Sequence, residues 1–490
     1  MAVAAFLAAA AVTGNAAAAA RPSFSVGYST ERALSGALQR SHGTLVGRVP
    51  ALHVAEVRPQ GPPLRFAAAI ACMPGIRFVE PLVARSARAE PGLAASVGSS
   101  FPLEWAYPAT HEDAVPVEVR SAARAFTIAV IDTGADLTAP DLAAKAPTGF
   151  NVDSGTTDVS DLIGHGTLVA SIAGGSGTNG EGIAGFGGDA RLLIVKAFSN
   201  GGFSDVDEAS AIVYAVDHGA RIINLSLAGP RSSTTERNAV AYATAHGALL
   251  VAAAGNEAQN GNPVEYPAAL LQPTGSEGVG GSGLTVGASD TGGTRASFSS
   301  FGSYLSLVAP GVNVLGAVSS AAPFSSFQPI GVPGSAGRYG YGTGTSFSAP
   351  QVAGAAALVW AANPDLSARG VAAILKETAS GSGSWTPQLG YGVLDAGAAV
   401  ARSAATPAVA TEGVRIGAAV HLTWHGHAVS TFRVLVSEPG GRRRVLLGPT
   451  SATTTTVPLA AEHAYVFTVE GLGPSGTPVA ESTPYLAARR

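Results

Sequence analysis

Between about residues 101 and 402, short runs of mainly apolar residues alternate with longer stretches of helical character. A strand with one face in water would alternate apolar and polar side chains, and these runs do not. They predict a parallel sheet that is covered by helices on both faces, and hence an α/β domain. The strand candidates are Thr127–Ile131, Arg191–Lys196, Ile222–Leu225 and Leu249–Ala253.

A smaller unit is predicted before this domain. Alternating residues from Leu52 to Val57, a helical stretch near Phe66 to Cys72 and an apolar run from Ile76 to Val79 indicate an α+β unit over residues 21–86. The stretch from Arg85 onward is rich in Ala, Ser and Gly, which is typical of a linker. We place this linker at residues 87–100 and expect cleavage within it.

The apolar pattern changes to a period of two residues near the end of the chain. It follows an Ala- and Thr-containing segment that we assign as a second linker, residues 403–412. Alternate apolar positions, such as Leu422 and Trp424, predict a small antiparallel β-sandwich over residues 413–490. The spacing of Trp424 and of the strand that begins at Tyr465 resembles a fibronectin type III module.

The first twenty residues are Ala-rich and apolar, and they end in small side chains before Arg21. This pattern predicts a signal peptide at residues 1–20, and hence a secreted, extracellular protein. No basic residue precedes the run and Thr13–Asn15 interrupt it, so a misassigned start and a weak anchor remain alternatives. No other segment has the roughly 20 uninterrupted apolar residues that span a bilayer.

Composition narrows the class of protein. Of the 490 residues, 46% are hydrophobic, 13% are charged and 62 are Gly, which excludes disorder and indicates a well-buried fold. The formal net charge of -4 gives no reason to expect a nucleic-acid partner. Because Cys72 is the only cysteine, an internal disulfide framework and a Cys-based zinc site are excluded.

Three short motifs carry residues with catalytic potential. Asp132 ends an apolar strand, which places a carboxylate at the sheet edge where α/β folds bind ligands. His165 stands between two glycines at the start of a helical stretch, and Ser346 precedes a helix expected over Gln351–Ala361. Taken singly, each residue is more often a turn, a core histidine or a helix cap than a catalyst.

Together, in the chain order Asp, His, Ser within one α/β domain, these motifs closely resemble the three signature motifs of the subtilisin-like (subtilase) family. The resemblance spans about Trp105 to Val400. Further matching segments are Asn224–Leu227, Ala254–Glu257, Ala296–Ser300, Ala309–Gly311 and Tyr391–Ala396.

The resemblance implies a serine endopeptidase that acts on proteins or peptides through an acyl-enzyme. Ser346 would be the nucleophile, His165 the general base and Asp132 the group that orients the imidazole. The Asn256 amide and the Ser346 backbone N–H would stabilise the oxyanion. Residues 21–86, which include the family-like Pro74–Pro81, would form an inhibitory propeptide, and we expect a monomer.

Two other classes of function are weighed. A non-catalytic subtilase scaffold would lack a triad residue, and none is missing. An adhesive role of the β-sandwich would need surface aromatic residues, but Trp424 and Tyr465 fit core positions better.

Substrate would be held as an added β-strand, as the resemblance implies. One segment would be Gly201-Gly202-Phe203, and the alternative for its two glycines is a simple turn. The usual Gly is replaced at Ala228, and Leu168 replaces the family's usual His. The remaining candidate substrate-binding residues are Ser226, Leu227, Ala228, Ala253, Ala254, Gly255 and Glu265.

Glu265 aligns with the segment that lines the far end of the S1 pocket in the family. A carboxylate there would pair with an Arg or Lys side chain at P1, the substrate residue that precedes the cleaved bond. The alternative is that Glu265 points to solvent and that S1 accepts large apolar residues.

The stretch Gly180–Gly185 matches a dinucleotide-binding pattern but follows a helix instead of a strand, so no cofactor is inferred from it. By resemblance this region is a calcium loop, in which Asp141 and Asn179 match ligand positions. We therefore expect structural Ca²⁺ and no catalytic cofactor, with solvated loop residues as the alternative.

Overall fold

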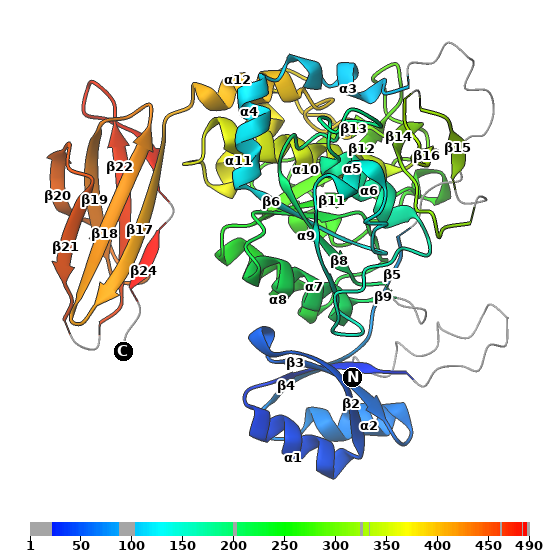
Figure 1. Ribbon diagram of the computed structural model, residues 1–490. Coiled ribbons are helices and arrows are strands. Elements are labelled where there is room, and N and C mark those ends of the chain that lie inside the picture. The colour runs from blue at the N-terminus through cyan, green and yellow to red at the C-terminus, as the bar shows by residue number, and fades with distance from the viewer. Residues whose placement is uncertain are drawn as a thin grey trace.

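The computed structural model describes residues 22–87, 103–198, 203–323, 327–332, 334–460, 463–482 and 484–487. It contains an N-terminal α+β unit, a central α/β domain and a C-terminal β-sandwich (Figure 1). The segment predicted as a signal peptide, residues 1–20, lies outside the described residues.

The central domain is built on a sheet of seven strands in the order β13-β12-β11-β10-β6-β8-β7, and each neighbouring pair is parallel. The four strands expected from the sequence are present and adjacent, so the predicted α/β class is confirmed. The strands are β6 (Thr127–Asp132), β7 (Thr148–Asn151), β8 (Arg191–Lys196), β10 (Ile222–Leu225), β11 (Leu249–Ala253), β12 (Gly283–Ser289) and β13 (Leu307–Pro310).

Both faces of this sheet are covered because successive side chains of a strand point to opposite faces. Ile128 and Val130 of β6 belong to the core shared with α6 (His165–Gly174) and α10 (Thr345–Ala362). Ala129 and Ile131 pack instead in the core with α7 (Asp205–Asp217) and α8 (Thr234–Ala245). The apolar runs therefore alternate between two cores, one on each side of the sheet.

Helix α10 passes through the centre of the domain, and every residue from Thr345 to Trp360 is buried. We predicted a helix that begins at Gln351, after Pro350, and this start is wrong. The helix begins at Thr345 and contains Pro350. Proline removes the bond to the carbonyl four residues earlier, here that of Ser346, and crowds it, but the Ser226 hydroxyl donates to this carbonyl and the helix continues. Among the described residues, no helix is both long and apolar enough to cross a membrane.

Shorter elements surround the central sheet. A separate antiparallel sheet has the order β14-β16-β15. The remaining elements of the domain are α3 (Ala106–Ala109), α4 (Val117–Ala122), α5 (Pro140–Ala143), α9 (Ala268–Leu271), α11 (Ala368–Glu377), α12 (Ala396–Ala404), β14 (Val314–Ala317), β15 (Gln328–Ile330) and β16 (Tyr339–Gly342).

The N-terminal unit is an antiparallel sheet, in the order β2-β3-β1-β4, packed on two helices. Figure 1 shows it beside α7 and α8 of the central domain. Cys72 is exposed and directly follows α2. The elements are β1 (Phe24–Tyr28), α1 (Glu31–Ser41), β2 (Gly43–Val49), β3 (Val54–Pro59), α2 (Pro63–Ala71) and β4 (Ile76–Pro81).

The segment just before the first predicted linker is ordered structure. Strand β5 (Ala84–Arg85) pairs antiparallel with β9 (Phe203–Ser204) of the central domain. The prediction that linker character begins at Arg85 is therefore wrong, because backbone pairing and burial of this arginine order the segment. Most of the linker lies outside the described residues.

The C-terminal part forms two antiparallel sheets over a common apolar core that contains Trp424, with Tyr465 packed against it. The predicted linker 403–412 is too long, since α12 ends at Ala404 and β17 begins at Ala408. The small and polar residues there pair along their backbone with β18. The strands are β17 (Ala408–Ile416), β18 (Ala419–His427), β19 (Thr431–Ser437), β20 (Arg444–Thr450), β21 (Thr454–Pro458), β22 (Tyr465–Leu472), β23 (Pro478–Glu481) and β24 (Tyr485–Ala487).

Candidate active site

The fold brings the acid and the base of the three motifs into contact. Asp132 is the last residue of β6 and His165 is the first residue of α6. The imidazole Nδ1 of His165 lies 2.8 Å from Oδ1 of Asp132, and both side chains are buried. Ser346 is the second residue of α10 and is only 4% exposed.

Glycine permits this close approach. A Cβ atom on Gly166 would lie 2.1 Å from the Gly134 carbonyl oxygen and 3.1 Å from Cβ of Asp132. Gly164 adopts a φ of 93°, in the left-handed region where a side chain is strained. The glycines around the histidine are therefore required by local packing.

Asp161 organises the loop before His165 and was missed in the sequence. Its Oδ1 accepts hydrogen bonds from the Thr133 hydroxyl at 2.9 Å and from the Gly164 N–H at 2.8 Å. Its Oδ2 accepts from the hydroxyl and the N–H of Thr167, at 2.6 and 2.9 Å. The available signal was an Asp three residues before a helix-opening Gly, a spacing suited to a capping turn.

The environment of His165 favours its charged form. Burial alone lowers the pKa of His165, but the charge of Asp132 and the hydrogen bond to it outweigh burial, and the pKa is raised overall. The other ring nitrogen, Nε2, is buried and has no hydrogen-bond partner within the described residues. That nitrogen can take up a proton.

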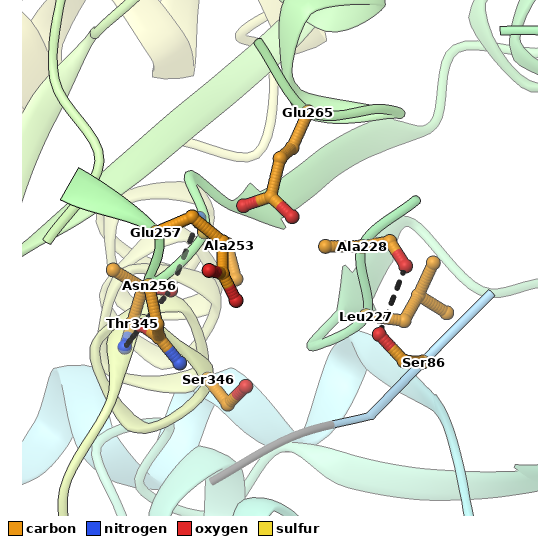
Figure 2. A pocket seen from close by; sticks show the side chains of 10 residues that line it. Ser86, Leu227, Ala228, Ala253, Asn256, Glu257, Glu265, Thr345 and Ser346 are labelled. Carbon is orange, nitrogen blue, oxygen red and sulfur yellow. Dashed lines mark hydrogen bonds between the residues drawn. The ribbon is translucent and has the colours of Figure 1, made fainter. Parts of the chain in front are cut away.

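Asn256 is held in one orientation beside the start of α10. Its side-chain oxygen accepts hydrogen bonds from the N–H and the hydroxyl of Thr345, at 2.9 and 3.0 Å. The same hydroxyl accepts a bond from the Gly255 N–H at 3.2 Å. Figure 2 shows Asn256 next to Ser346 on one wall of the pocket.

The side chain of Ser226 contacts the backbone of the predicted nucleophile. Because Pro350 has no N–H, the carbonyl of Ser346 lacks the bond that residue 350 would donate within the helix. The fully buried hydroxyl of Ser226 donates to this carbonyl instead, at 2.7 Å, and accepts from Nδ2 of Asn224 at 2.9 Å. Its side chain thus supports the backbone of Ser346.

A pocket opens beside Ser346, and most of the predicted substrate-binding residues line it. Ala254 does not: it is fully buried and its N–H donates to the Val286 carbonyl at 2.9 Å. Gly201 and Gly202 lie outside the described residues. The lining residues are Ser86, Leu227, Ala228, Ala253, Gly255, Asn256, Glu257, Glu265, Thr345 and Ser346.

Glu265 points into this pocket, across from Ser346 (Figure 2). Its Oε2 atom is buried, and a Cβ atom on Gly255 would lie 1.5 Å from it. Burial, and then the charge of Glu265, raise the pKa of the neighbouring Tyr304 phenol. The alternative that Glu265 points to solvent is wrong.

Asp141 and Asn179 also lie together, with Oδ1 of Asp141 3.0 Å from Nδ2 of Asn179. The Asp141 carboxylate accepts further hydrogen bonds from the Ile183 N–H and the Tyr339 hydroxyl. A half-turn of the Asn179 amide would place two oxygens side by side, the donor type that calcium prefers. Within the described part of the chain, no group of three or more His, Cys, Asp or Glu side chains could hold a metal ion.

Comparison with known proteins identifies the family of this chain. The model of the subtilase family, peptidase S8, matches residues 123–392, more than half of the chain. This chain belongs to the subtilase family.

Curated relatives agree with this assignment. The subtilase is 37% identical over 233 residues to a thermophilic serine proteinase of Bacillus sp. strain AK1, a match that covers 47% of this chain and 51% of the relative. It is 38% identical to the cell wall-associated protease of Bacillus subtilis, covering 51% of this chain but only 25% of that protein. It is 37% identical to subtilisin Savinase of Lederbergia lenta, and this match covers 56% of this chain and 89% of that protein. The subtilase thus spans about half the length of the first of these relatives and a quarter of the length of the second.

Among solved structures, the subtilase resembles fervidolysin from Fervidobacterium pennivorans, a keratinolytic enzyme related to subtilisin. The TM-score is 0.64 at 23% identity, and the match covers 97% of this chain and 76% of fervidolysin. At this identity the likeness supports the fold.

Proposed function

We propose that this subtilase is a secreted serine endopeptidase with Ser346 as nucleophile, His165 as general base and Asp132 as the orienting acid. The observation that carries the proposal is the 2.8 Å contact between Nδ1 of His165 and Oδ1 of Asp132, with Nε2 left to accept a proton. Asp132 fixes the tautomer and stabilises the imidazolium that forms when Ser346 attacks a carbonyl.

The tetrahedral intermediate carries a negative oxygen, which the Ser346 N–H and the Asn256 amide stabilise. Since Thr345 holds the oxygen of that amide, the nitrogen faces away from Thr345 and serves as the donor. His165 then returns its proton to the leaving amine, and water hydrolyses the acyl-enzyme by the same route.

Fluorophosphonate labelling tests this mechanism. After linker cleavage the enzyme should incorporate one label, located on Ser346 by peptide mass mapping, and Ser346→Ala should incorporate none. Unlabelled Ser346 in folded, cleaved enzyme would sink the proposal.

The N-terminal unit, residues 22–86, acts as an inhibitory propeptide in this proposal. Its last residues support the idea, since the N–H and carbonyl of Ser86 each form a 2.9 Å bond with Ala228 at the pocket. A strand so bound blocks the approach of substrate. The intact chain should be inactive, and activity should rise as the linker is cut.

Glu265 gives the enzyme a preference for Arg or Lys at P1. An apolar P1 side chain would exclude water from this carboxylate and offer it no opposite charge, at a cost of about 1–3 kcal/mol, or roughly 10–100-fold in kcat/KM. Matched Arg and Phe peptides, assayed with wild type and Glu265→Gln, measure this preference. A Phe preference that the substitution leaves unchanged excludes this role.

Calcium bound near Asp141 and Asn179 stabilises the folded enzyme in this proposal, since an ion that binds only the folded state shifts unfolding by mass action. Chelation with EDTA should lower the melting temperature of the wild type and leave Asp141→Ala almost unaffected. An unchanged wild-type curve excludes a stabilising site there.

A further inference from the structure

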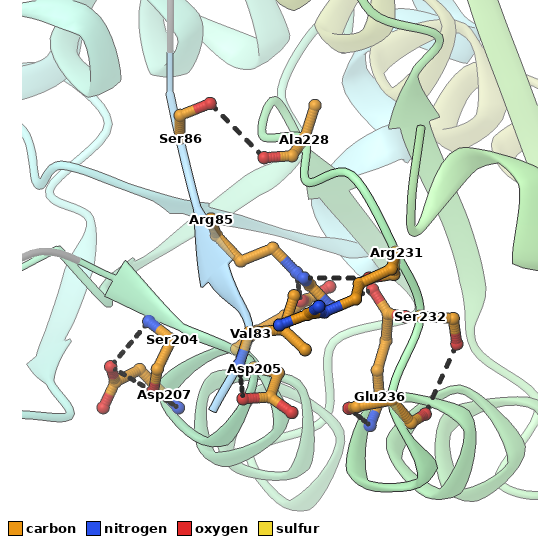
Figure 3. A network of polar contacts seen from close by, with 12 residues as sticks. Val83, Arg85, Ser86, Ser204, Asp205, Asp207, Ala228, Arg231, Ser232 and Glu236 are labelled. Carbon is orange, nitrogen blue, oxygen red and sulfur yellow. Dashed lines mark hydrogen bonds and ion pairs between the residues drawn. The ribbon is translucent and has the colours of Figure 1, made fainter. Parts of the chain in front are cut away.

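The side chain of Arg85 is enclosed between α7 and α8 (Figure 3). Its Nε lies 2.6 Å from Oε2 of Glu208, and its Nη2 lies 2.6 Å from Oε1 of Glu236. Its Nη1 donates to the carbonyl of Arg231 at 3.3 Å. All three charged side chains are 0% exposed, so solvent does not screen these pairs.

This enclosure stabilises a positively charged side chain. Without one, the burial of its two carboxylates would cost free energy. Burial raises the pKa of Glu208, despite the opposing charge of Arg85. Burial, and then the charge of Glu208, raise the pKa of Glu236 to about 8. Two buried carboxylates side by side repel each other unless a positive group separates them. We call this enclosure, formed by Glu208, Glu236 and the Arg231 carbonyl, the acidic pocket.

The backbone around Arg85 is bound as a β-strand. Ala84 and Arg85 pair with Ser204 and Phe203 on one side, and Ser86 pairs with Ala228 on the other. Asp205 accepts a hydrogen bond from the Val83 N–H at 3.0 Å, which fixes the entry of this strand. An extended chain held between two segments is the arrangement that peptide substrates adopt by strand addition.

The pairing register of this strand tells how many residues separate the acidic pocket from the nucleophile along a bound peptide. Ser86 pairs antiparallel with Ala228. In such a pairing, the residue two positions after Ser86, or after a substrate residue in its place, lies opposite Ser226. The Ser226 hydroxyl donates to the carbonyl of Ser346. The substrate residue opposite Ser226 therefore lies at the nucleophile and is P1. A substrate residue in the position of Arg85 is then P4, three before P1. In this chain the P1 position falls on Arg88, which lies outside the described residues.

We propose that the acidic pocket is the S4 subsite of this enzyme and selects arginine at P4, a position that the chain's own Arg85 occupies before cleavage. The proposal rests on the endopeptidase function proposed above. Two carboxylates and one carbonyl engage three different guanidinium nitrogens, a fork that the single nitrogen of lysine cannot match. A leucine there would leave Glu208 and Glu236 buried and unpaired.

Quenched peptides of the form X-Ser-Ala-Arg and X-Ser-Ala-Phe, each followed by the same leaving segment, test the selection. With enzyme from the self-cleaved chain, X = Arg should exceed X = Leu in kcat/KM by at least about tenfold in both series, with Lys between them. Two series are used so that the P1 preference does not decide the result. Moving the Arg one position upstream should abolish its advantage.

Glu208→Gln should reduce the ratio of Arg to Leu at least about tenfold while hydrolysis of the Leu peptide continues, which shows that the variant is folded. Glu277→Gln, a change at an exposed glutamate, should keep the wild-type ratio. Equal rates for Arg and Leu in active wild type would overturn the S4 proposal and leave the endopeptidase function standing.

A binding measurement covers the case in which no peptide is cleaved. In the full chain carrying Ser346→Ala and Arg85→Ala, the chain's own strand competes equally with both peptides because it no longer carries the arginine, and a dye-labelled Val-Ala-Arg-Ser-Ala peptide should bind at least about tenfold more tightly than its Leu counterpart. Equal binding of the two peptides would overturn the acidic pocket as an arginine site. Absence of turnover with selective binding would instead reject the catalytic function and keep the pocket.

Discussion

At the scale of single residues, hydrogen bonds hold the catalytic groups and their loops in place. Thr345 fixes the Asn256 amide, Asp161 fixes the loop before His165, and Asp132 fixes the imidazole. Thr345 and Asn256 stand 89 positions apart and Asp132 and His165 stand 33 positions apart, whereas Asp161 acts on its own loop. Small changes at these positions should therefore alter rates more than they alter the fold.

The acidic limb of the pH profile is a prediction at this scale. His165 must be neutral to accept the Ser346 proton, and its pKa is raised from the ordinary value of about 6.5. The kcat/KM for a peptide with Ala at P4 should therefore rise with pH and reach half its maximum above about 6.5. Asp132→Asn should move this limb to lower pH, besides lowering the rate. A wild-type limb below pH 6 would contradict the raised pKa.

At the scale of elements, the start of α10 lacks one helical hydrogen bond, and a bond from another segment takes its place. Pro350 leaves the Ser346 carbonyl without its helical partner, and Ser226 supplies the bond from the loop after β10. The nucleophile is thereby tied to the segment that binds substrate. A free helix end would have no such tie.

A double-mutant cycle measures whether the bond from Ser226 replaces the helical bond that Pro350 cannot donate. Ser226→Ala should lower the free energy of unfolding by about 1–3 kcal/mol, because it leaves a buried carbonyl unsatisfied. Pro350→Ala provides an N–H that can bond to the same carbonyl, so Ser226→Ala should cost less in that background. Denaturant unfolding of the Ser346→Ala forms gives the four stabilities without self-digestion. Equal costs in both backgrounds would mean that the two bonds do not replace each other.

The sequence predicted the elements better than the contacts between them. Apolar runs marked four strands of the central sheet because burial on both faces leaves a local signature. Asp161 was missed since acceptor-rich turns and active-site loops use the same residue types. Linker composition was noted from Arg85 onward because the partners of this arginine, Glu208 and Glu236, stand 123 and 151 positions away. Composition alone does not reveal such distant partners.

At the scale of the whole molecule, the N-terminal unit docks on the ends of α7 and α8. The Glu80 carboxylate accepts bonds from the N–H and the hydroxyl of Thr234, the first residue of α8, at 2.8 and 2.7 Å. Ser25 and Thr235 share a further buried hydrogen bond. A carboxylate at this helix end also meets the positive end of the helix dipole.

Glu80→Ala should weaken this docking by about 1–2 kcal/mol, or roughly 5–30-fold, because a charge-assisted bond at a helix end is lost. Once the linker is cut, dilution should release active enzyme at a correspondingly higher protein concentration than in the wild type. Arg48→Ala, which removes an exposed pair with Glu31 inside the N-terminal unit, is the control and should not change release. Identical dilution curves for Glu80→Ala and the wild type would contradict this interface.

The exposed position of Cys72 has a practical consequence. It is the only thiol of the chain and it belongs to the N-terminal unit, so a maleimide dye attaches to that unit alone. While the unit is docked, the dye tumbles with the whole zymogen, and after departure it tumbles with a fragment of fewer than 100 residues. Fluorescence anisotropy of the unmodified sequence should therefore follow zymogen conversion in real time, independently of any substrate.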